Sequence, residues 1–512
     1  MPTARSLLRL LASSFALLAL AAPPAGATWS IVLVNTKTGE IGIAAATCLE
    51  SLDLRKLLPV MVVSKGAGVA QSQIDTGAAN RKKIFDQLLL GTPPAEIIQI
   101  ALNGDFFKKT RQYGIVDLSP DAAGYTGGGA MAFKLDVHGG FDDYEYAIQG
   151  NVLTGQPVID AAVQAVTRTQ GSLGDRLMAG MEAARSMGGD GRCSCSPSAP
   201  TSCGSPPAAG FTKAAHIGFF MVARAGDTDG TCNATIGCAT GSYWCNLNEA
   251  NLFAADTDPV LLLASDYADF KIAAAGHPDG LRSLSAFDDS EVLGDGASTR
   301  QLTVALFDLD GHAILHGGAT FTVTHAPGSA GLSQLGAVVD HGDGTYALEL
   351  VAGAGSGTDL LSVRADDGTQ GATLFPYPQL QHRPALLASA PELSAGSGAP
   401  LVFDLLGPTA AAGRTAVLLL SAAGTAPGQS LPGGLLLPLN PDRLFALSAH
   451  FGPAGVLAGN PGPLDALSHA TVAFTPPAGS LLPFVGQTLS AAWATLRPAD
   501  FVSNAVSVAV TP

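Results

Sequence analysis

The order of strands and helices along the first half of the chain limits its fold most. Short apolar or alternating runs bounded by turn residues predict strands, and apolar residues three and four positions apart predict helices. Because the two kinds of element come in groups rather than in strict alternation, the pattern favours a layered α+β domain over a parallel βαβ sheet. The predicted strands are 28–36, 41–48, 60–73, 111–119, 124–135, 144–155 and 215–227, and the predicted helices are 77–90, 93–102, 157–169 and 172–187.

Downstream of this domain, the sequence predicts two β-sandwich domains. Residues 302–307 alternate as in a strand, and Asp/Gly-rich turns separate further short strand-like runs, as is typical of an immunoglobulin-like sandwich. The 61 Gly and 33 Pro of the chain, with only 13% charged residues, also favour β domains with many loops. We therefore expect an α+β domain at 28–280, an immunoglobulin-like β-sandwich at 290–375 and a C-terminal β-sandwich at 380–512.

The N-terminus has the composition of a secretion signal. Basic residues precede the short apolar run LLASSFALLALAA, and small residues follow at 25–27. Such a segment predicts cleavage after Ala27, which makes residues 1–27 a signal peptide. A competing site after Ala21 would leave further residues in front of Thr28. The apolar run is too short for a membrane helix, so we expect a secreted or otherwise extracytoplasmic protein without a membrane span.

The seven cysteines agree with export to an oxidising compartment. Six of them cluster in a Gly/Ser/Pro-rich region and are candidates for up to three disulfides, whose connectivity the sequence leaves open. Zinc is the alternative, but the spacing C-x-C-x7-C differs from the usual paired C-x2-C knuckles. Cys48 is left over in an apolar run, which predicts a buried free thiol. The disulfide candidates are Cys193, Cys195, Cys203, Cys232, Cys238 and Cys245.

Charge and composition argue against several classes of partner. The formal net charge is -15 and no Lys/Arg-rich run occurs, so nucleic acid is not an expected partner. The acidic turns of the immunoglobulin-like segment offer oxygen ligands for calcium, but hairpin chemistry explains them without a metal. The three histidines of the last domain, His382, His450 and His469, lie far apart in sequence. We therefore expect no metal and no cofactor.

Cleavage after residue 27 would make Thr28 the first residue of the mature chain. A hydroxyl in that position lies beside its own α-amino group, whose ordinary pKa is about 8. The neutral amine can accept the hydroxyl proton, so an N-terminal threonine can act as a nucleophile without a separate base. The alternative is that Thr28 only begins a strand, where β-branched residues are common.

The run TWSIVLVNTKTGEIGIAAATC, which begins at Thr28, resembles the start of a bacterial family of Ntn-hydrolase-like proteins classed as a domain of unknown function. Further motifs follow in the family's order: GAGVAQSQ, RQYGIVD, YTG, AIQGNVLTG and GGDGR. The resemblance covers residues 28–270 and implies a four-layer αββα sandwich with the nucleophile at the end of a strand. Residues 295–370 resemble the immunoglobulin-like modules of bacterial surface proteins such as invasins, which implies a spacer or an adhesive module.

The resemblance implies roles for individual residues. Thr28 matches the family's leading threonine, which implies a catalytic nucleophile. The family's Q-G-N segment matches Gln149, Gly150 and Asn151. An Asn side chain near the cleft can donate to the oxyanion of a tetrahedral intermediate, so Asn151 is the second catalytic candidate. The alternative for Asn151 is a turn residue that ends a strand.

Three further residues are candidates for substrate binding. Lys65 would lower the pKa of the nucleophile or its amine electrostatically, although a solvated surface lysine is the alternative. Gln71 and Gln149 are candidate hydrogen-bond donors in the cleft. His216 follows a cysteine-bearing insertion that departs from the family pattern, and it invites a catalytic assignment that the threonine mechanism does not need.

Together these features predict a secreted amidohydrolase with Thr28 as nucleophile, acting on an unknown small-molecule or peptide amide. The alternative is a non-catalytic binding or adhesion protein, in which the β-sandwich domains contact a cell surface or matrix.

Overall fold

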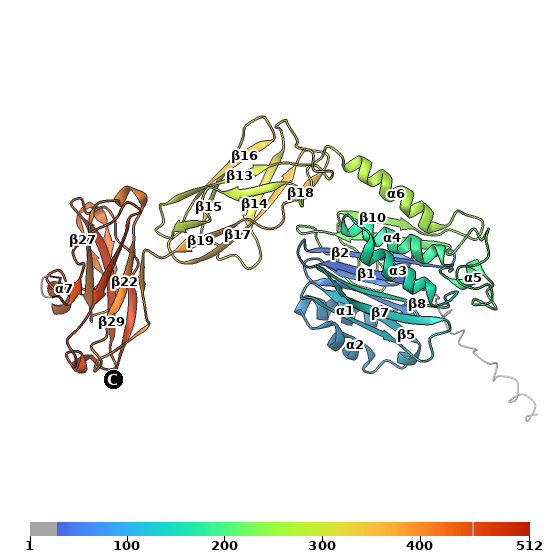
Figure 1. Ribbon diagram of the computed structural model, residues 1–512, viewed down its shortest axis with the longest axis horizontal. Coiled ribbons are helices and arrows are strands. Elements are labelled where there is room, and N and C mark those ends of the chain that lie inside the picture. Colours follow the sequence, from blue (N-terminus) through green and yellow to red (C-terminus); the bar gives the residue numbers. More distant parts are fainter. Residues whose placement is uncertain (1–27, 453–454) are drawn as a thin grey trace, which may run out of the picture. The chain divides into compact units, whose positions relative to one another are not determined.

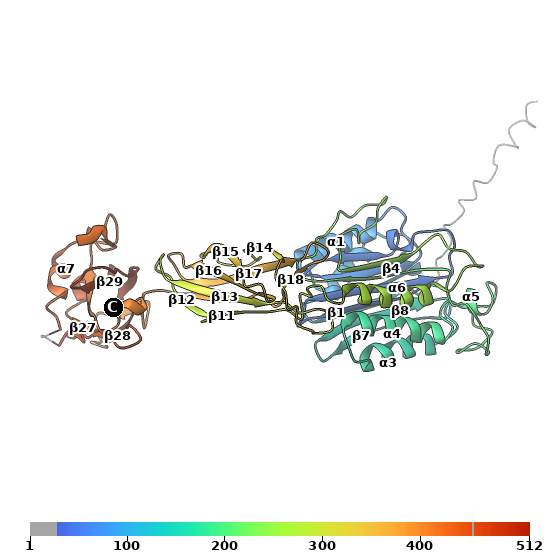
Figure 2. The same cartoon turned by 90° about the horizontal axis from the view of Figure 1, so that it is seen from above.

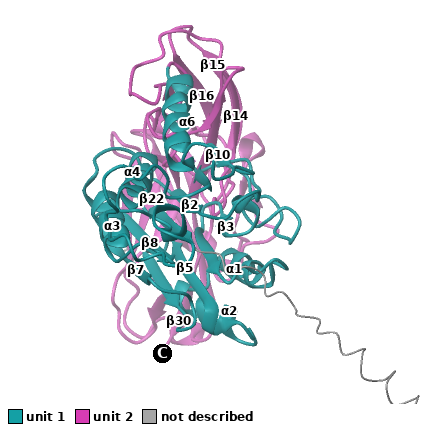
Figure 3. Cartoon of the chain, turned by 90° about the vertical axis from the view of Figure 1, so that its right-hand side faces the viewer, with its two compact units in different colours: residues 1–275 teal, residues 276–512 magenta. Residues whose placement is uncertain are grey.

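The computed structural model describes residues 28–452 and 455–512 (Figure 1). The chain divides into two compact units, Met1–Ala275 and Gly276–Pro512, which we call unit 1 and unit 2 (Figure 3). The predicted signal peptide at 1–27 lies outside the described residues.

Unit 1 is built on two antiparallel sheets. The first sheet has the strand order β10-β9-β2-β1-β8-β7, and the second has the order β3-β4-β5-β6. The first sheet consists of β1 (Thr28–Asn35), β2 (Glu40–Thr47), β7 (Lys134–Phe141), β8 (Tyr144–Asn151), β9 (Ile217–Ala223) and β10 (Cys245–Glu249). The second consists of β3 (Pro59–Val62), β4 (Gly66–Ser72), β5 (Arg111–Asp117) and β6 (Asp121–Thr126).

Helices cover the outer face of each sheet. Those of unit 1 are α1 (Ala79–Leu90), α2 (Pro94–Leu102), α3 (Pro157–Arg168), α4 (Leu173–Ser186), the short α5 (Gly191–Ser194) and α6 (Pro259–Ala274). Figure 1 shows α3 and α4 on one side of the two sheets and α1 and α2 on the other. The layers therefore run helix, sheet, sheet, helix.

Side-chain alternation along β1 explains this layering. Trp29, Ile31 and Leu33 are buried in the core that the first sheet shares with α3 and α4. Val32 and Val34 point the other way, into the core between the two sheets. Every residue of β1 is buried, because this central strand has a neighbouring strand on each side and a packed layer on each face.

The outer face of the second sheet carries its own core. Ile84 and Leu88 of α1 and Ile97 of α2 pack with Tyr113 and Ile115 of β5. Hydrophobic burial of this kind, about 1.5–3 kcal/mol for each large apolar side chain, holds the two helices on the sheet.

Several elements differ from the sequence prediction, which also lacks the short α5 and the strand β10. The strand predicted at 60–73 is a hairpin of β3 and β4, because the chain turns at Ser64, which has φ 60. The strand predicted at 124–135 is two strands, since β6 ends at Thr126 and β7 begins at Lys134. The helix α6, which packs beside α4 (Figure 2), was not predicted. Its apolar residues are spread around the helix instead of forming one face, so the helical period is weak.

Unit 2 begins with a β-sandwich. One sheet has the order β11-β13-β16-β15, and the other has the order β12-β19-β17-β14, with β18 paired to β17. Leu302, Leu348 and Leu350 of the first sheet pack with Leu361 and Val363 of the second. The strands are β11 (Leu284–Phe287), β12 (Glu291–Leu293), β13 (Thr299–Ala305), β14 (Thr320–His325), β15 (Gln334–Asp340), β16 (Thr345–Val351), β17 (Gly357–Asp366), β18 (Gly371–Thr373) and β19 (Gln379–Arg383).

A second β-sandwich completes unit 2. The prediction that β-sandwich structure follows the α+β domain is therefore confirmed. Its sheets have the orders β20-β22-β28-β26 and β21-β30-β29-β23-β27. Trp493 is fully buried in its core and donates from Nε1 to Ala385 O at 2.8 Å. The elements are β20 (Leu386–Ala388), β21 (Glu392–Ser394), β22 (Leu401–Leu406), β23 (Thr415–Ser421), the pair β24 (Gln429–Ser430) and β25 (Leu436–Leu437), α7 (Arg443–Ser448), β26 (Leu457–Ala458), β27 (Gly462–Pro463), β28 (His469–Phe474), β29 (Thr488–Leu496) and β30 (Val506–Thr511).

Candidate functional site

Thr28 begins the central strand β1 at one end of the first sheet. It pairs with Asn151, the last residue of β8. The register of β1 with β2, in which Trp29 pairs with Ala46, puts Thr47 on the other side of Thr28. Cross-strand neighbours project to the same face. The alternation along β1 turns this face, and with it the row of Thr47, Thr28 and Asn151, toward the second sheet.

The Thr28 hydroxyl is in an unusual environment. Thr28 is 1% exposed, and its Oγ1 has no hydrogen-bond partner among the described residues. Most buried hydroxyl groups are paired, so an unpaired one at the end of a central strand marks a candidate reactive group. Ala27 precedes Thr28 in the full chain, so the Thr28 nitrogen is a peptide nitrogen until residues 1–27 are removed.

Asn151 is held in place by the chain that follows it. Asn151 is fully buried, and Val152 adopts φ 54, which a β-branched residue rarely adopts. Backbone hydrogen bonds fix this conformation, since Val152 N–H donates to Met131 O at 3.3 Å and Val152 O accepts from Gly191 N–H at 2.9 Å. Such strained residues occur where surrounding structure over-determines them, often at functional sites.

A series of buried polar side chains runs between the sheets beside Thr28. Gln149 Nε2 donates to Ser30 Oγ, and the Ser30 hydroxyl donates to Gln71 Oε1 at 2.7 Å. Gln71 Nε2 donates to Thr28 O at 3.2 Å and to Gln112 Oε1 at 2.8 Å. All four side chains are fully buried. The two sequence-predicted glutamines therefore lie at the site, where Gln71 holds the Thr28 carbonyl directly and Gln149 is linked to Gln71 through Ser30.

A glycine makes room for this network. A Cβ at Gly114 on β5 would lie 1.9 Å from Gln149 Oε1, so only glycine allows Gln149 to occupy the space between the sheets. Gln149 Oε1 has no hydrogen-bond partner among the described residues. Thr28 Oγ1 and Gln149 Oε1 are thus both buried oxygens without a hydrogen-bond partner in the described part of the chain.

Lys65 does not belong to this site. It is exposed in the turn between β3 and β4, whereas Gln71, near the other end of β4, contacts Thr28. Six residues of extended strand separate the two positions by about 20 Å. The structure therefore places Lys65 away from Thr28, because the two ends of β4 lie at opposite ends of the sheet, and its exposed position agrees with the alternative of a solvated surface lysine.

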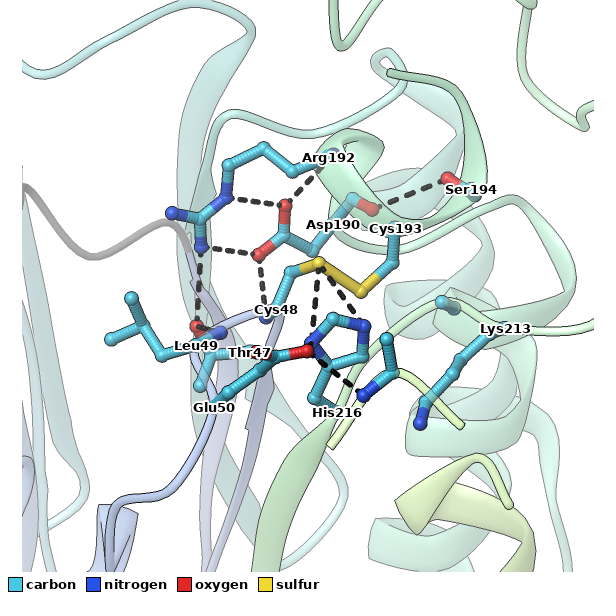
Figure 4. The surroundings of a disulfide bond; sticks show 12 residues. Thr47, Cys48, Leu49, Glu50, Asp190, Arg192, Cys193, Ser194, Lys213 and His216 are labelled. Carbon is cyan, nitrogen blue, oxygen red and sulfur yellow. Dashed lines mark hydrogen bonds and ion pairs between the residues drawn. A yellow bond between two sulfur atoms is a disulfide. The ribbon is translucent and has the colours of Figure 1, made fainter. Parts of the chain in front are cut away.

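An ion pair between the buried Asp190 and the half-buried Arg192 lies next to Thr47 (Figure 4). Asp190 is fully buried and forms hydrogen bonds to Arg192, with Nη2 at 2.8 Å from Oδ2 and Nε at 3.1 Å from Oδ1. Arg192 Nη2 also donates to Thr47 Oγ1 at 3.5 Å. The Cys48 amide donates to Asp190 Oδ2 at 2.7 Å. Through these contacts the loop at 188–192 is fixed to the end of β2, one strand away from Thr28.

The same region carries a disulfide that the sequence prediction missed. Cys48, at the end of β2, is bonded to Cys193 in α5, with a Cα–Cα distance of 5.7 Å. The predicted free thiol at Cys48 is therefore wrong. The other disulfides are Cys195–Cys203 and Cys232–Cys238.

Cys245 is the free cysteine, which corrects its prediction as a disulfide partner. It is 2% exposed in β10, within the core between the first sheet and its helices. Burial raises the pKa of the Cys245 thiol to about 12. The sequence suggested a disulfide because Cys245 is close in sequence to the cysteines of the loops. In the structure it belongs to β10, and its side chain points into the core.

His216 lies beside the Cys48–Cys193 disulfide. Its ring nitrogens are 3.8 and 3.9 Å from Cys48 Sγ, and Nδ1 is 3.3 Å from Glu50 Oε1 (Figure 4). Burial, followed by the charge of Lys213, lowers the pKa of His216. Its backbone N–H donates to Thr47 O at 2.8 Å, on the strand next to Thr28.

Sequence reasoning missed four polar residues of this region. Ser30 and Gln112 occupy strand positions that look like ordinary alternation, and only the pairing of two distant sheets shows that they meet. Asp190 and Arg192 belong to the GGDGR motif, but the sequence analysis assigned neither a role. Their opposite charges, two positions apart, could have predicted the ion pair.

Comparisons with known proteins divide the chain in the same way. Residues 28–200 match the model of a family of unknown function, DUF1028. Residues 281–374 match the model of invasin domain 3. The comparison with curated proteins found no match. The first part of the chain is thus similar to a family of unknown function, and the part that follows is similar to an invasin module.

Several solved structures are also similar to the chain. A DUF1028 protein from Silicibacter pomeroyi is 19% identical, with 48% of this chain and 88% of that chain covered and a TM-score of 0.34. The adhesin InvE of Yersinia pseudotuberculosis is 19% identical, with 46% and 60% covered and a TM-score of 0.18. Invasin, a bacterial integrin-binding protein, is 9% identical, with 94% and 60% covered and a TM-score of 0.19. The chain thus spans about three fifths of the length of each of these two adhesins.

None of the helices in the described ranges combines the length and the apolar character that crossing a membrane requires.

Proposed function

We propose that unit 1 is an N-terminal-nucleophile amidohydrolase of the Ntn class and that Thr28 is its nucleophile. The observation that carries this proposal is the position of Thr28, which begins the central strand with a buried hydroxyl that has no partner among the described residues. The helix-sheet-sheet-helix order of layers, as expected for an Ntn hydrolase, supports the assignment. So does the match of residues 28–200 to the family of unknown function whose opening the sequence resembles.

The reaction begins once residues 1–27 are removed. The new α-amine of Thr28 accepts the proton of its own hydroxyl as Oγ1 attacks the substrate carbonyl. The amine then passes that proton to the leaving nitrogen, and a water hydrolyses the resulting ester by the reverse sequence. This chemistry needs no cofactor. The substrate is an amide, either a small molecule or a peptide.

Asn151 supplies the second element of the proposed mechanism. It is the cross-strand neighbour of Thr28, and its side chain projects to the same face. Its amide N–H therefore donates to the oxyanion that forms when Thr28 attacks, a kind of contact whose removal costs about 10²–10³-fold in rate in other hydrolases. Gln71 and Gln149 position Thr28 rather than bind substrate, because their amides are engaged inside the network.

A second function is favoured by the match of residues 281–374 to invasin domain 3. In this proposal the β-sandwiches of unit 2 carry a surface or adhesive role and contact a cell surface or matrix. Three disulfides support an extracytoplasmic location, where such bonds persist. The two functions are compatible, since they belong to different units.

The N-terminus of the exported protein tests the enzyme proposal. We expect N-terminal sequencing and intact mass of material from the cell envelope or medium to give Thr28 as the first residue. A mature chain that begins at Ala22 would contradict the proposal, because its amine would lie six residues from the hydroxyl.

A further inference from the structure

The two cysteines of the Cys48–Cys193 disulfide and the neighbouring His216 form a group of three side chains of the kinds that bind metals. Cys48 Sγ, Cys193 Sγ and a ring nitrogen of His216 all lie within 4.8 Å of one another. Figure 4 shows the imidazole facing the sulfur pair. The sulfurs are joined to each other, so they do not bind a metal as they stand. Two thiolates and an imidazole, in contrast, are a typical ligand set for zinc.

The spacing of these atoms fits a metal centre after a small change. In a tetrahedral zinc site, bonds of about 2.3 Å to sulfur and 2.1 Å to nitrogen put S and N about 3.6 Å apart, and two sulfurs about 3.8 Å apart. His216 nitrogens are already 3.8 and 3.9 Å from Cys48 Sγ. Once the disulfide is opened, rotation of the two Cys side chains separates the sulfurs, and the Cα–Cα distance of 5.7 Å leaves room for a metal between them.

The surroundings supply an outer shell. Glu50 Oε1 lies 3.3 Å from His216 Nδ1, and the Ala254 amide donates to the same oxygen at 2.8 Å. A carboxylate on one ring nitrogen orients a histidine so that the other nitrogen faces a metal. The Cys48 amide is anchored to the buried Asp190, which keeps the end of β2 in place when the disulfide opens. Cys48, Cys193 and His216 are half-buried, so a metal ion has access to them.

We propose that Cys48, Cys193 and His216 bind one zinc ion when the Cys48–Cys193 disulfide is reduced, and that the disulfide and the metal exclude each other. A dithiol reductant gives two electrons and two protons to the disulfide and becomes a disulfide itself. Zinc then binds the two thiolates with the release of two protons, and water completes the coordination. This site is independent of the function proposed for Thr28.

The other two disulfides offer matched controls within the same chain. Among the described residues, neither Cys195–Cys203 nor Cys232–Cys238 has a third ligand of this kind within reach. Zinc should therefore protect one pair of reduced cysteines and not the other two pairs.

The test uses the full chain, reduced anaerobically with a phosphine and then alkylated with iodoacetamide, with or without one equivalent of Zn²⁺. Peptide mass mapping reads each cysteine separately. We expect Zn²⁺ to slow alkylation of Cys48 and Cys193 at least about 10-fold and to leave the other two pairs unchanged. His216→Gln, which keeps all three disulfides, should abolish the protection, and Glu50→Gln should weaken zinc binding about 10-fold.

A second measurement identifies the ligands directly. In a chain with Cys195, Cys203, Cys232 and Cys238 changed to Ser, reduction followed by Co²⁺ should give the thiolate charge-transfer and tetrahedral d–d absorption bands at one Co²⁺ per chain. The oxidised chain should give neither band. The proposal would be overturned if all six cysteines were alkylated at the same rates with and without Zn²⁺. This includes the case in which reduction unfolds the chain and exposes them all. Protection that persists in His216→Gln would overturn it as well.

Discussion

Thr28, the first residue of β1, and Asn151, the last residue of β8, are paired in register at the same end of the first sheet of unit 1. This pairing joins two residues that are more than a hundred positions apart in sequence, and it gives one face of the sheet both a hydroxyl and an amide. The proposed chemistry depends on their being held there together.

Replacement of Asn151 should slow the chemistry without removing the nucleophile. We expect Asn151→Ala to lower the rate at which a β-lactone acylates Thr28 by about 10²–10³-fold, because an oxyanion donor is lost. The rate is measured by intact mass against time on the mature protein. Asn103→Ala, at an exposed position after α2, is the control and should react as wild type does. An unchanged rate in Asn151→Ala would remove Asn151 from the mechanism.

The buried network should contribute to the stability of unit 1. Ser30→Ala leaves Gln149 Nε2 and Gln71 Oε1 without their shared partner, so we expect the free energy of unfolding to fall by about 1–3 kcal/mol. Fluorescence of Trp29 and Trp244 in a Trp493→Phe background follows urea unfolding of this unit. The exposed Ser198→Ala should change the free energy of unfolding by less than about 0.5 kcal/mol. Equal effects would contradict the network.

Gly114 is predicted to be required for the position of Gln149. A Cβ there would lie 1.9 Å from Gln149 Oε1, so Gly114→Ala must displace that side chain or the strand, at a cost of about 1–3 kcal/mol in the free energy of unfolding. Gly128→Ala is the matched control, because nothing lies within 4 Å of its added Cβ. The same fluorescence assay compares the two variants, and similar unfolding midpoints would show that the network tolerates the displacement.

Asp117, at the end of β5, should give unit 1 a specific pH dependence. Burial raises the pKa of this carboxyl from its ordinary 3.8 to about 6. Between these values the folded chain keeps a proton that the unfolded chain has lost, so stability falls as the pH rises through this window. Relative to Asp117→Asn, the wild type should lose about 1–3 kcal/mol between pH 4 and 7. A difference that does not change with pH would contradict the burial of an ionisable group here.

The cysteines should react as the structure pairs them. We expect the folded, unreduced chain to show no thiol reactive with iodoacetamide at pH 8, because burial raises the pKa of Cys245 to about 12. In denaturant without reductant, one thiol should react, and peptide mapping should place it at Cys245. Labelling at Cys48 instead would contradict the Cys48–Cys193 bond.

Sequence patterns were most informative where chemistry is local. The strand that starts at Thr28 and the α3–α4 pair follow from alternation and helical spacing, and Gln71 and Gln149 were found through motifs. The sequence was least informative where the fold joins distant segments. Cys48 meets Cys193 across 145 positions, and Lys65 lies in the turn before β4, away from Thr28, because neither register nor strand direction can be read from spacing alone. The role of Ser30 and Gln112 in the buried network could not be predicted, because their hydrogen bonds to Gln71 form only where the two sheets pack together.

Reaction of the mature protein with a hydroxyl-directed β-lactone tests the role of Thr28 most directly. Peptide mapping should locate a single acyl ester on Thr28 Oγ1, Thr28→Ser should still be labelled, and Thr28→Ala should not. Equal labelling of wild type and Thr28→Ala, or acylation at another residue, would contradict a nucleophile at this position.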